Sequence, residues 1–408
     1  MAMTDLAQVL CGMLVLLAPL AGAGLALMNS GLGRSRSAAH AMLAPLCVTA
    51  AAVLAYFVCG WSWQSFPGGD HAITVPGASW NWIGFEPLFM RGVSNSLAAW
   101  LQMFSVALAA IIPLGAAGER WRLSAACAST AIFAGWTYPI FAHWVWGGGW
   151  LAQLGFRDAG GSSTIQAVGG LTALAMARLL GPRHGKYDSE GMPAAFPGHN
   201  AVLVLFGCFL TWVGWIGLNG AGSLLFAPDS ADIAAIAMNT TLSAAAGLLA
   251  AAALTRARFG RPDASLCANG WTAGLVASSA ACTWIAPAAA AFVGAVAGLL
   301  VTYCVEWLDV RLRIDDPAGS VSVHVAGGLW GVLAVALFGP GKWSAQFAGI
   351  AALLLFVLPM TYALNRLLNR FYPQRVPPDS EPHGLDLYEL GAGAYPEFVT
   401  RRDDFRPR

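Results

Sequence analysis

Apolar runs long enough to cross a lipid bilayer alternate with short polar stretches along almost the whole chain. A bilayer core about 30 Å thick takes about 20 residues of α-helix. When the runs are cut at charge clusters and at Pro and Gly, they give eleven predicted spans, of which the eighth is the shortest. These are residues 6–28, 38–61, 96–118, 123–144, 162–180, 200–220, 231–254, 267–283, 286–308, 320–338 and 344–366. The pattern therefore predicts an all-α polytopic membrane protein with eleven transmembrane helices.

Positive charge marks one side of this predicted bundle, since Lys and Arg in short loops collect on the cytoplasmic side of a membrane. One set of alternate loops holds only Arg91, Arg157 and Lys342. The other set, with the tail arginines, holds Arg34, Arg36, Arg120, Arg122, Arg183, Lys186, Arg256, Arg258, Arg261, Arg311 and Arg313. The amino terminus is therefore predicted outside and the carboxyl terminus in the cytoplasm. We divide the chain into a transmembrane domain, residues 1–368, and a cytoplasmic tail, residues 369–408.

Two stretches 158 positions apart resemble each other. They read DAGGSSTIQAVGGL from Asp158 and DPAGSVSVHVAGGL from Asp316, with six of fourteen positions identical. The first opens the fifth predicted span and the second opens the tenth, so each closes a block of five helices. Because five is odd, the two blocks enter the membrane in opposite directions. The repeat predicts a five-plus-five inverted architecture followed by an eleventh helix, with a substrate path near the midplane.

The polar residue of each repeat, Gln166 or His324, follows its Asp by eight positions. Eight helical residues rise about 12 Å, which brings both side chains toward the middle of a core about 30 Å thick. We therefore expect Gln166 and His324 to meet. The Gly pairs that follow, 169–170 and 327–328, are expected to lie on the same helix face and to let the two helices pack closely.

Each of these polar residues has a structural and a functional interpretation. A histidine in an apolar helix is often a hydrogen-bonded core residue, whereas His324 in a symmetric repeat is favoured as part of a path. Asp158 and Asp316 precede helices and are expected to accept hydrogen bonds from free backbone N–H groups there. Asp158 is in addition a candidate for orienting an entering cation.

Composition agrees with a membrane protein and removes several function classes. The chain is 57% hydrophobic and 11% charged, against roughly a quarter charged in soluble proteins. Its 22 Lys and Arg against 21 Asp and Glu leave a net charge of +1, which excludes a nucleic-acid binder. The eight cysteines form no C-x-x-C pair, and neither H-E-x-x-H nor G-x-S-x-G occurs. We therefore expect no metal, no cofactor and no enzyme activity.

Several long motifs make the chain resemble the Amt/Mep/Rh ammonium transporter family, of the bacterial Amt type, over about residues 6 to 397. They include AHWVWGGGWLA at 142–152, GAAGERWRLSA at 115–125, WIGLN at 215–219, MNTTLSAAAG at 238–247, VEWLDVRLRIDDPAGSVSVHVAGGLWG at 305–331 and GLDLYELG at 384–391. The resemblance implies eleven spans, an outside amino terminus, an inverted repeat and a homotrimer in the cytoplasmic (inner) membrane, with one pore per subunit.

The family recruits ammonium at an outer aromatic vestibule, passes it through a gate of two Phe rings and conducts it along an apolar pore with two histidines. Carried over by motif, Trp146 matches the vestibule Trp, Asp158 the essential Asp, Trp215 the pore-side Trp and His324 the second histidine. Aromatic faces attract cations. The resemblance thus implies ammonium or ammonia as the substrate, moving through lipid-embedded helices.

Other pore positions depart from the family pattern. The vestibule and gate Phe positions hold Leu101 and Ser105, with Phe104 one position away on another helix face, and the second gate position holds Leu218. Because NGAGS carries one extra residue, the vestibule serine position falls on either Gly222 or Ser223.

Gln166 stands where the first histidine belongs. A carboxamide can hydrogen-bond to His324 but cannot take up a proton near neutral pH. We expect an ammonium transporter or channel with impaired or altered conduction; the alternative is an ammonium-binding sensor with the transporter fold and little transport.

The tail motif GLDLYELG is the family's docking segment for neighbouring subunits and for a PII-type regulatory protein. Leu390 occupies a usual His position in it. A PII partner and a solvated tail without a partner both remain open.

Overall fold

The computed structural model describes residues 3–64, 81–93, 95–395 and 397, and within these ranges regular structure is helical apart from two isolated β-bridges. The helical stretches are α1 Asp5–Leu17 with α2 Pro19–Leu32; η1 Ser35–Ser37, α3 Ala38–Ala55, η2 Tyr56–Gly60 and α4 Trp61–Gln64; α5 Ser96–Ala117; α6 Leu123–Ile132, η3 Phe133–Thr137 and α7 Tyr138–Trp146; α8 Trp150–Leu154; η4 Ser162–Ala167 with α9 Val168–Leu180; α10 Ala201–Phe226; η5 Pro228–Ser230; α11 Ile233–Phe259; α12 Ala264–Ser279; α13 Pro287–Trp307 with η6 Leu308–Leu312; η7 Ser322–Ala326 with α14 Gly327–Phe338; α15 Trp343–Ala352, η8 Leu353–Val357 and α16 Leu358–Phe371; and η9 Pro378–Ser380 and η10 Asp386–Leu390.

Each of the eleven predicted spans overlaps one long helical stretch in the described part of the chain. Eight of these stretches are long and apolar enough to cross a membrane, whereas residues 123–146, 264–279 and 322–338 are not among the eight. The protein is therefore an all-helical multi-span membrane protein, and the full count of eleven spans stays a prediction. The last stretch runs to Phe371, past the predicted limit of 366 and three residues beyond the predicted domain boundary.

Polar residues begin several of these helices, because the first backbone N–H groups of a helix lack partners within it. At five helices, the side chain of the N-cap residue accepts such hydrogen bonds. They are Thr4, Asn95, Asn200, Asp232 and Asp263. Pro19 divides the first stretch and starts α2, where the missing N–H costs nothing.

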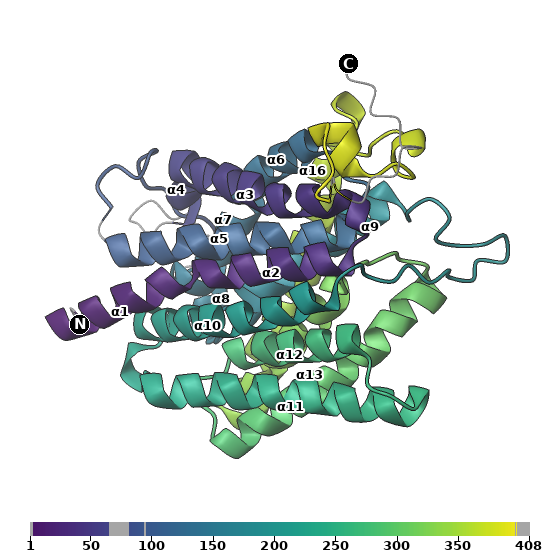
Figure 1. The fold of residues 1–408 in the computed structure, drawn as a ribbon. Helices are drawn as coiled ribbons and strands as arrows, with labels where there is room; N and C mark the ends of the chain where they lie inside the picture. Colours follow the sequence, from purple (N-terminus) through teal and green to yellow (C-terminus); the bar gives the residue numbers. More distant parts are fainter. Residues whose placement is uncertain (1–2, 65–80, 94, 396, 398–408) are drawn as a thin grey trace.

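The long helices run side by side in one bundle (Figure 1). Glycine permits the closest contacts between them. A Cβ on Gly24 of α2 would lie 2.5 Å from the carbonyl oxygen of Gly207 on α10, and a Cβ on Gly207 would lie 2.6 Å from that of Gly24. Helix backbones in membranes associate through such small residues, because lipid supplies no hydrophobic force to drive helices together.

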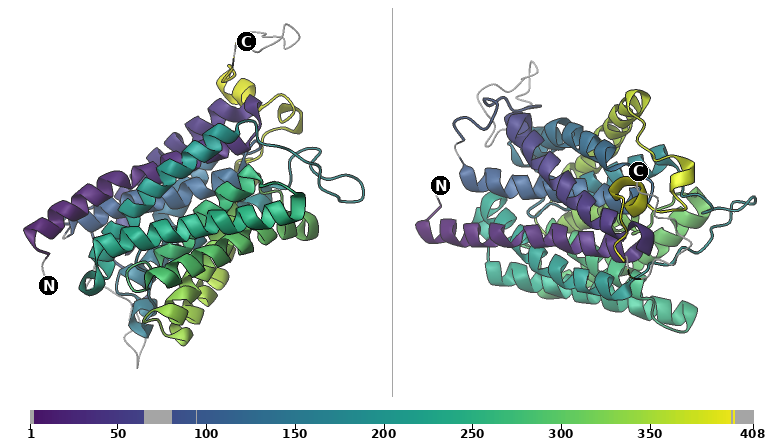
Figure 2. Two further views of the ribbon diagram at one scale, coloured as in Figure 1. Left: turned by 60° about the horizontal axis from the view of Figure 1, so that its bottom comes forward. Right: turned by 45° about the horizontal axis from the view of Figure 1, so that its top comes forward.

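Successive loops lie at alternate ends of the bundle. The carboxyl-terminal tail lies at one end, which we call the tail side, with the loops around residues 33–37, 118–122, 181–200 and 313–321. The opposite end, which we call the far side, holds residues 81–84, 147–161 and 339–342. The loop between α9 and α10 extends away from the bundle (Figure 2).

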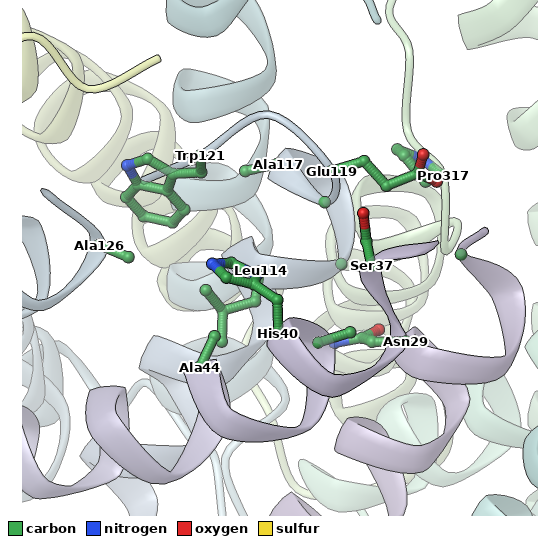
Figure 3. A pocket seen from close by; sticks show the side chains of 14 residues that line it. Asn29, Ser37, His40, Ala44, Leu114, Ala117, Glu119, Trp121, Ala126 and Pro317 are labelled. Atoms are coloured by element: carbon green, nitrogen blue, oxygen red, sulfur yellow. The ribbon is translucent and has the colours of Figure 1, made fainter. Parts of the chain in front are cut away.

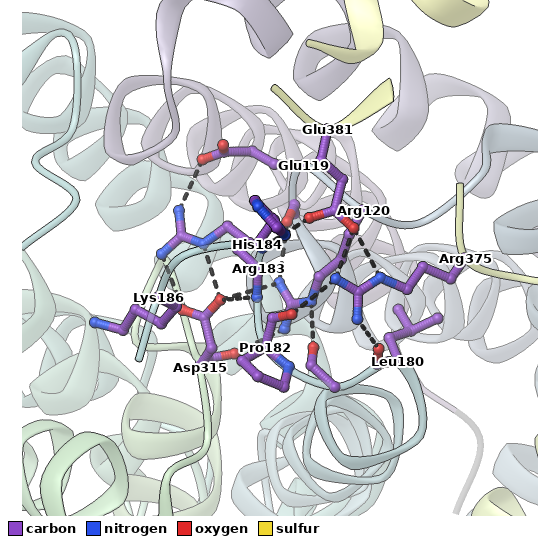
Figure 4. A network of polar contacts seen from close by, with 12 residues as sticks. Glu119, Arg120, Leu180, Pro182, Arg183, His184, Lys186, Asp315, Arg375 and Glu381 are labelled. Carbon is purple, nitrogen blue, oxygen red and sulfur yellow. Dashed lines mark hydrogen bonds and ion pairs between the residues drawn. The ribbon is translucent and has the colours of Figure 1, made fainter. Parts of the chain in front are cut away.

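A cluster of buried ion pairs ties the tail-side loops together (Figure 4). Arg183 donates two hydrogen bonds of 2.9 Å to the carboxylate of Asp315 and one of 2.8 Å to Glu119. Arg120, which is fully buried, donates to the carbonyl oxygens of residues 118, 181 and 315. Glu119 also pairs with Arg34. Loops that are far apart in the sequence are thus held by charge-assisted bonds, which are stronger than neutral ones.

The tail docks on this side and caps two helices that have no capping side chain of their own. The carboxylate of Asp386 accepts from the backbone N–H groups of Ala39 and His40 at the start of α3, at 3.0 and 2.7 Å. Glu389 accepts from the N–H of Leu123 at the start of α6 and lies 2.7 Å from the His40 ring. Anionic caps are favourable at helix N-termini. Residues 398–408, with the last tail arginines, lie outside the described residues.

The buried ion pairs predict an effect of Asp315→Asn on stability. Removing this charge leaves the Arg183 guanidinium buried without its main partner, which should lower the free energy of unfolding by about 3–5 kcal/mol. Thermal melting of the detergent-solubilised protein at pH 7 measures it. Asp379→Asn, which changes an exposed carboxylate, is the matched control and should leave the melting temperature unchanged.

The same variant should show a defined pH dependence. Burial acts to raise the pKa of the Asp315 carboxyl, but Arg120 and Arg183 outweigh burial and hold this pKa at about 2, below the ordinary 3.8. Because folding lowers the pKa, the stabilisation is present above about pH 4 and is lost as the pH falls toward 2. The difference in melting temperature between wild type and Asp315→Asn should shrink at pH 3; an unchanged difference contradicts the assignment.

Candidate substrate pathway

The two repeat segments enter the bundle through matching irregular turns. Residues Ser162–Ala167 and Ser322–Ala326 both form π-helical turns, which then continue as α9 and α14. Their starts lie at opposite ends of the bundle, so the two segments run in opposite directions, as the repeat predicts. A π-turn widens the helix by one residue and is common at functional sites. Gln166 lies in the first turn and His324 in the second.

Gln166 and His324 meet in the interior, as expected. The distance from the Gln166 Oε1 to the His324 Nδ1 is 2.9 Å, and the residues are 0% and 2% exposed. With the amide oxygen facing the ring, Nδ1 carries the hydrogen and Nε2 keeps its lone pair. The Gln166 Nε2 has no hydrogen-bond partner among the described residues. The pair therefore offers a free amide donor and an imidazole acceptor.

Close approach of the two helices depends on one glycine from each repeat. A Cβ on Gly170 would lie 2.8 Å from the Val325 backbone nitrogen, and a Cβ on Gly328 would lie 2.7 Å from the Ser162 carbonyl oxygen. The expectation that all four glycines share one face is wrong. Gly169 faces α5 and Gly327 faces α12, because consecutive residues on a helix point about 100° apart.

The two repeat aspartates bind backbone N–H groups at the starts of their segments. Both carboxylate oxygens of Asp158 accept, from the N–H groups of residues 161 to 164 and from the hydroxyls of Ser163 and Thr164. Asp316 accepts from the N–H groups of residues 320 to 322. The capping interpretation is confirmed for both. The cation-orienting role of Asp158 stays a prediction, and its carboxylate is already engaged by these donors.

Trp146 is held on the far side by two contacts. Its indole N–H donates to the Asp158 carbonyl oxygen at 2.7 Å. Its ring stacks on Phe226, with ring centroids 4.4 Å apart and planes 11° apart. Phe226 lies at the end of α10, outside the family motifs, so no sequence pattern singled it out. The Trp146 indole and the loop that carries Asp158 are thereby held together next to the start of the first repeat segment.

The remaining α10 candidates are buried in a row toward the far side. Trp215 is fully buried and donates to the Ser279 hydroxyl at 3.2 Å. Leu218 is 2% exposed, and Ser223, which is fully buried, lies 3.7 Å from the Cys282 sulfur. The neighbouring Gly222 packs directly against the Ala159 carbonyl oxygen, where a side chain has no room.

On α5 the two candidate vestibule and gate positions are buried. Leu101 and Ser105 are 2% and 1% exposed, and the Ser105 hydroxyl donates to the Leu101 carbonyl oxygen. Phe104 is only partly buried, and its ring centroid lies 6.2 Å from that of Trp100.

Sequence reasoning missed a polar pair beside these positions. The Tyr138 hydroxyl donates to the Gln102 Oε1 at 2.8 Å, and the Gln102 Nε2 has no partner among the described residues. A glutamine in an otherwise apolar helix was the available signal.

A small cavity adjoins the pair on the tail side of His324. It is lined by His324, Val323, Ser320, Ala318, Thr272, Asn269, Asn29, Met28 and Leu25. Within the described residues no three His, Cys, Asp or Glu side chains are grouped so that they could hold a metal ion. The surroundings of the pair are largely apolar, and their polar groups are amides, hydroxyls and one imidazole.

Comparison with known proteins identifies what this arrangement is similar to. The profile of the Ammonium Transporter Family matches residues 7–395. The chain is 36% identical to ammonium transporter Amt2 of Archaeoglobus fulgidus, an alignment that covers 96% of this chain and 87% of the relative. It is 29% identical to the ammonium transporter of Bacillus subtilis, over 91% of this chain and 94% of that protein.

Solved structures share the fold. A protein described as a sensor Amt protein aligns with a TM-score of 0.86 and 28% identity, over 94% of this chain and 98% of that one. Mep2 of Candida albicans aligns with a TM-score of 0.80 and 25% identity, over 97% of this chain and 92% of its own.

The crossing of the two repeat segments predicts different costs for two glycine substitutions. Gly170→Ala should destabilise the protein by about 1–3 kcal/mol, because the added methyl group meets backbone atoms that cannot give way. Gly327→Ala, whose Cβ would lie 3.3 Å from the nearest atom, a Val276 methyl carbon, is the matched control. Thermal melting in detergent compares them. Equal melting temperatures for the two variants would show that the crossing is not tightly packed.

Proposed function

Because this chain belongs to the ammonium transporter family, we propose that it carries ammonium or ammonia through one pore per subunit, with conduction lowered by its altered pore residues. It is a multi-pass membrane transport protein and not an enzyme. We further propose that it has eleven spans, with the far side outside the cell and the tail side in the cytoplasm. The concentration of Arg and Lys on the tail side supports this orientation.

The proposed route runs from Trp146 and Ser223 on the far side, past Leu101, Ser105, Trp215 and Leu218, to the pair of Gln166 and His324. Burial of all these side chains supports a dry passage. Moving a cation out of water costs a large amount of free energy, because the cation loses its favourable hydration. Ammonia therefore passes more easily than ammonium, provided that ammonium gives up its proton before it enters the buried part of the path.

The hydrogen bond between Gln166 and His324 is the observation that carries the proposal. A buried amide N–H without a partner costs about 1–3 kcal/mol, and the Gln166 Nε2 is such a group. Ammonia has a lone pair and can accept from this N–H, whereas ammonium has no lone pair and cannot. The pair therefore suits the neutral species at the centre of the path.

Proton transfer along the pair is the step that the glutamine removes. A carboxamide does not take up a proton near neutral pH, so a relay that uses two imidazoles is not available here. The far-side entrance also has leucine and serine at 101 and 105 in place of rings. Each lost cation–ring contact weakens cation capture by about 0.5–2 kcal/mol. Both changes favour slow conduction.

An ammonium sensor with the transporter fold is the second candidate. The likeness to the sensor Amt protein supports it, since the backbone folds agree with a TM-score of 0.86. The altered residues cluster in the proposed path, while the helix-packing glycines and the docked tail are intact. A protein that binds ammonium and signals without efficient transport has this combination.

Assembly and partners are proposed from family membership. We propose a homotrimer in lipid, with apolar outer faces such as Leu6, Met13 and Leu355, which are exposed by 79%, 61% and 79%. The tail segment is a candidate contact for a PII-type protein. Leu387 and Tyr388 remain exposed by 41% and 44% when the tail is docked and are accessible to such a partner.

We expect purified protein in proteoliposomes to give much smaller ammonium currents than a family member with both pore histidines, because the proton relay is missing. Solid-supported-membrane electrophysiology measures the currents, and calorimetry on the same preparation measures ammonium binding. Binding with currents at background favours the sensor. Family-sized currents contradict the proposal of impaired conduction.

Gln166→His should raise the ammonium current by about tenfold or more, since a positioned acid–base group typically contributes 10²–10⁴-fold to a proton-transfer step. Gln166→Asn, which keeps an amide at this position, is the matched control and should not raise the current. A melting temperature close to wild type shows that the fold is retained. If Gln166→His leaves the current unchanged, the pair is not the limiting point of the path.

A further inference from the structure

A second cavity lies on the tail side, directly beyond the one that adjoins His324. It has a volume of about 40 Å³. Its lining includes Asn29, Ala44, Gly115, Gly118 and Pro317. Trp121 and Ala126 border it on one side and Glu119 and Pro317 on the other (Figure 3).

The two cavities meet at one place. Asn29 lines both of them, and Pro317 of the outer cavity is followed in the chain by Ala318 of the inner one. The outer cavity therefore adjoins the inner one, which is lined by His324.

Gly115 of α5 lies where the outer and the inner cavity adjoin each other. A Cβ on Gly115 would lie 2.6 Å from the Asn29 Oδ1 and 3.0 Å from the Ala318 Cβ, and it would run into the Ser320 hydroxyl. Two separate segments, α2 with Asn29 and the loop with Ala318 and Ser320, thus converge on a position of α5 that has no side chain. Protein interiors transmit such crowding, because they are close-packed. The opening between the two cavities is set by these few atoms.

Polar groups stand at both ends of the narrow point. The Asn29 amide and the Ser320 hydroxyl lie there, and the inner cavity continues to the His324 ring. Amide and hydroxyl groups offer both donors and acceptors to a small solute such as ammonia or water.

We propose that the pore leaves the protein through these two cavities, and that Asn29 and Ser320, converging on Gly115, form its inner gate for ammonia and water. The inference rests on the proposed path, whose tail-side exit it identifies. The gate is narrow because three backbone segments are in contact, and the tail holds the frame of the outer cavity by capping α3 and α6.

The accessibility of introduced cysteines tests whether the outer cavity, the gate and the inner cavity follow one another from the tail side. The test does not require ammonium flux. Ala44→Cys places a thiol in the outer cavity, and Thr272→Cys places one in the inner cavity. The full-length protein is treated with 2-aminoethyl methanethiosulfonate from the tail side of oriented vesicles, with free cysteine as a scavenger on the other side. Peptide mass spectrometry reads each position separately, so the native cysteines remain, and buried Cys208, which lines neither cavity, is the internal reference.

Both introduced thiols should react faster than Cys208, and Ala44→Cys should react faster than Thr272→Cys. Adding Gly115→Ala should slow the labelling of Thr272→Cys by at least about tenfold, because the added methyl group overfills the gate. Labelling of Ala44→Cys should stay unchanged. Gly118→Ala is the matched control, since its Cβ would have no neighbour closer than 3.4 Å.

Asn29→Ala removes side-chain volume from the gate and should therefore change the labelling rate in the opposite direction. It should speed the labelling of Thr272→Cys, so the test does not depend on Gly115→Ala folding well. The proposal is overturned if Thr272→Cys reacts equally fast with and without both gate variants, or if Ala44→Cys is no more reactive than Cys208.

The outcome separates this exit from the proposed function. If labelling follows the expected order while Gln166→His carries no ammonium current, the exit stands and the transport proposal fails. If Gln166→His conducts but Thr272→Cys is not labelled from the tail side, transport stands and the exit is wrong.

Discussion

The hydrogen bond between Gln166 and His324 is the contact on which the interior of this protein depends. Two polar side chains in a low-dielectric core are each costly alone and acceptable together. Their meeting requires two segments to cross with backbones almost in contact, which Gly170 and Gly328 allow. It also requires each residue to sit in a widened π-turn. One interaction thus accounts for the glycines, the turns and the antiparallel repeat.

Charge is kept away from this crossing and placed at its two ends. On the far side, the carboxylate of Asp158 is surrounded by N–H and O–H donors of the segment that it caps. On the tail side, Arg183 and Asp315 pair within a buried cluster that joins loops far apart in sequence. Ionised groups need such partners because transfer from water is expensive. The passage between these ends therefore has His324 as its one ionisable group among the pathway residues described here.

The tail takes part in the same arrangement. Asp386 and Glu389 supply the caps that α3 and α6 lack, so the tail-side ends of two long helices are completed by residues nearly 350 and 270 positions away. The outer cavity lies between these helices. Because the tail supplies these caps, the ends of α3 and α6 and the outer cavity between them depend on the position of the tail.

The amino-acid sequence by itself determined the positions of the long apolar helical stretches and the meeting of Gln166 with His324. Apolar run length and the 158-position repeat encode these features directly, since both follow from bilayer thickness and helical rise. The sequence also indicated the capping role of Asp158 and Asp316. Other features were decided by tertiary structure alone: which glycine of each pair faces the other repeat, the stacking of Phe226 on Trp146, and the pairing of Arg183 with Asp315. These depend on helix rotation and on contacts between distant segments, which a local pattern does not record. The same holds for the docked tail and the crossing at Gly115, because both exist only where separate segments converge in the packed bundle.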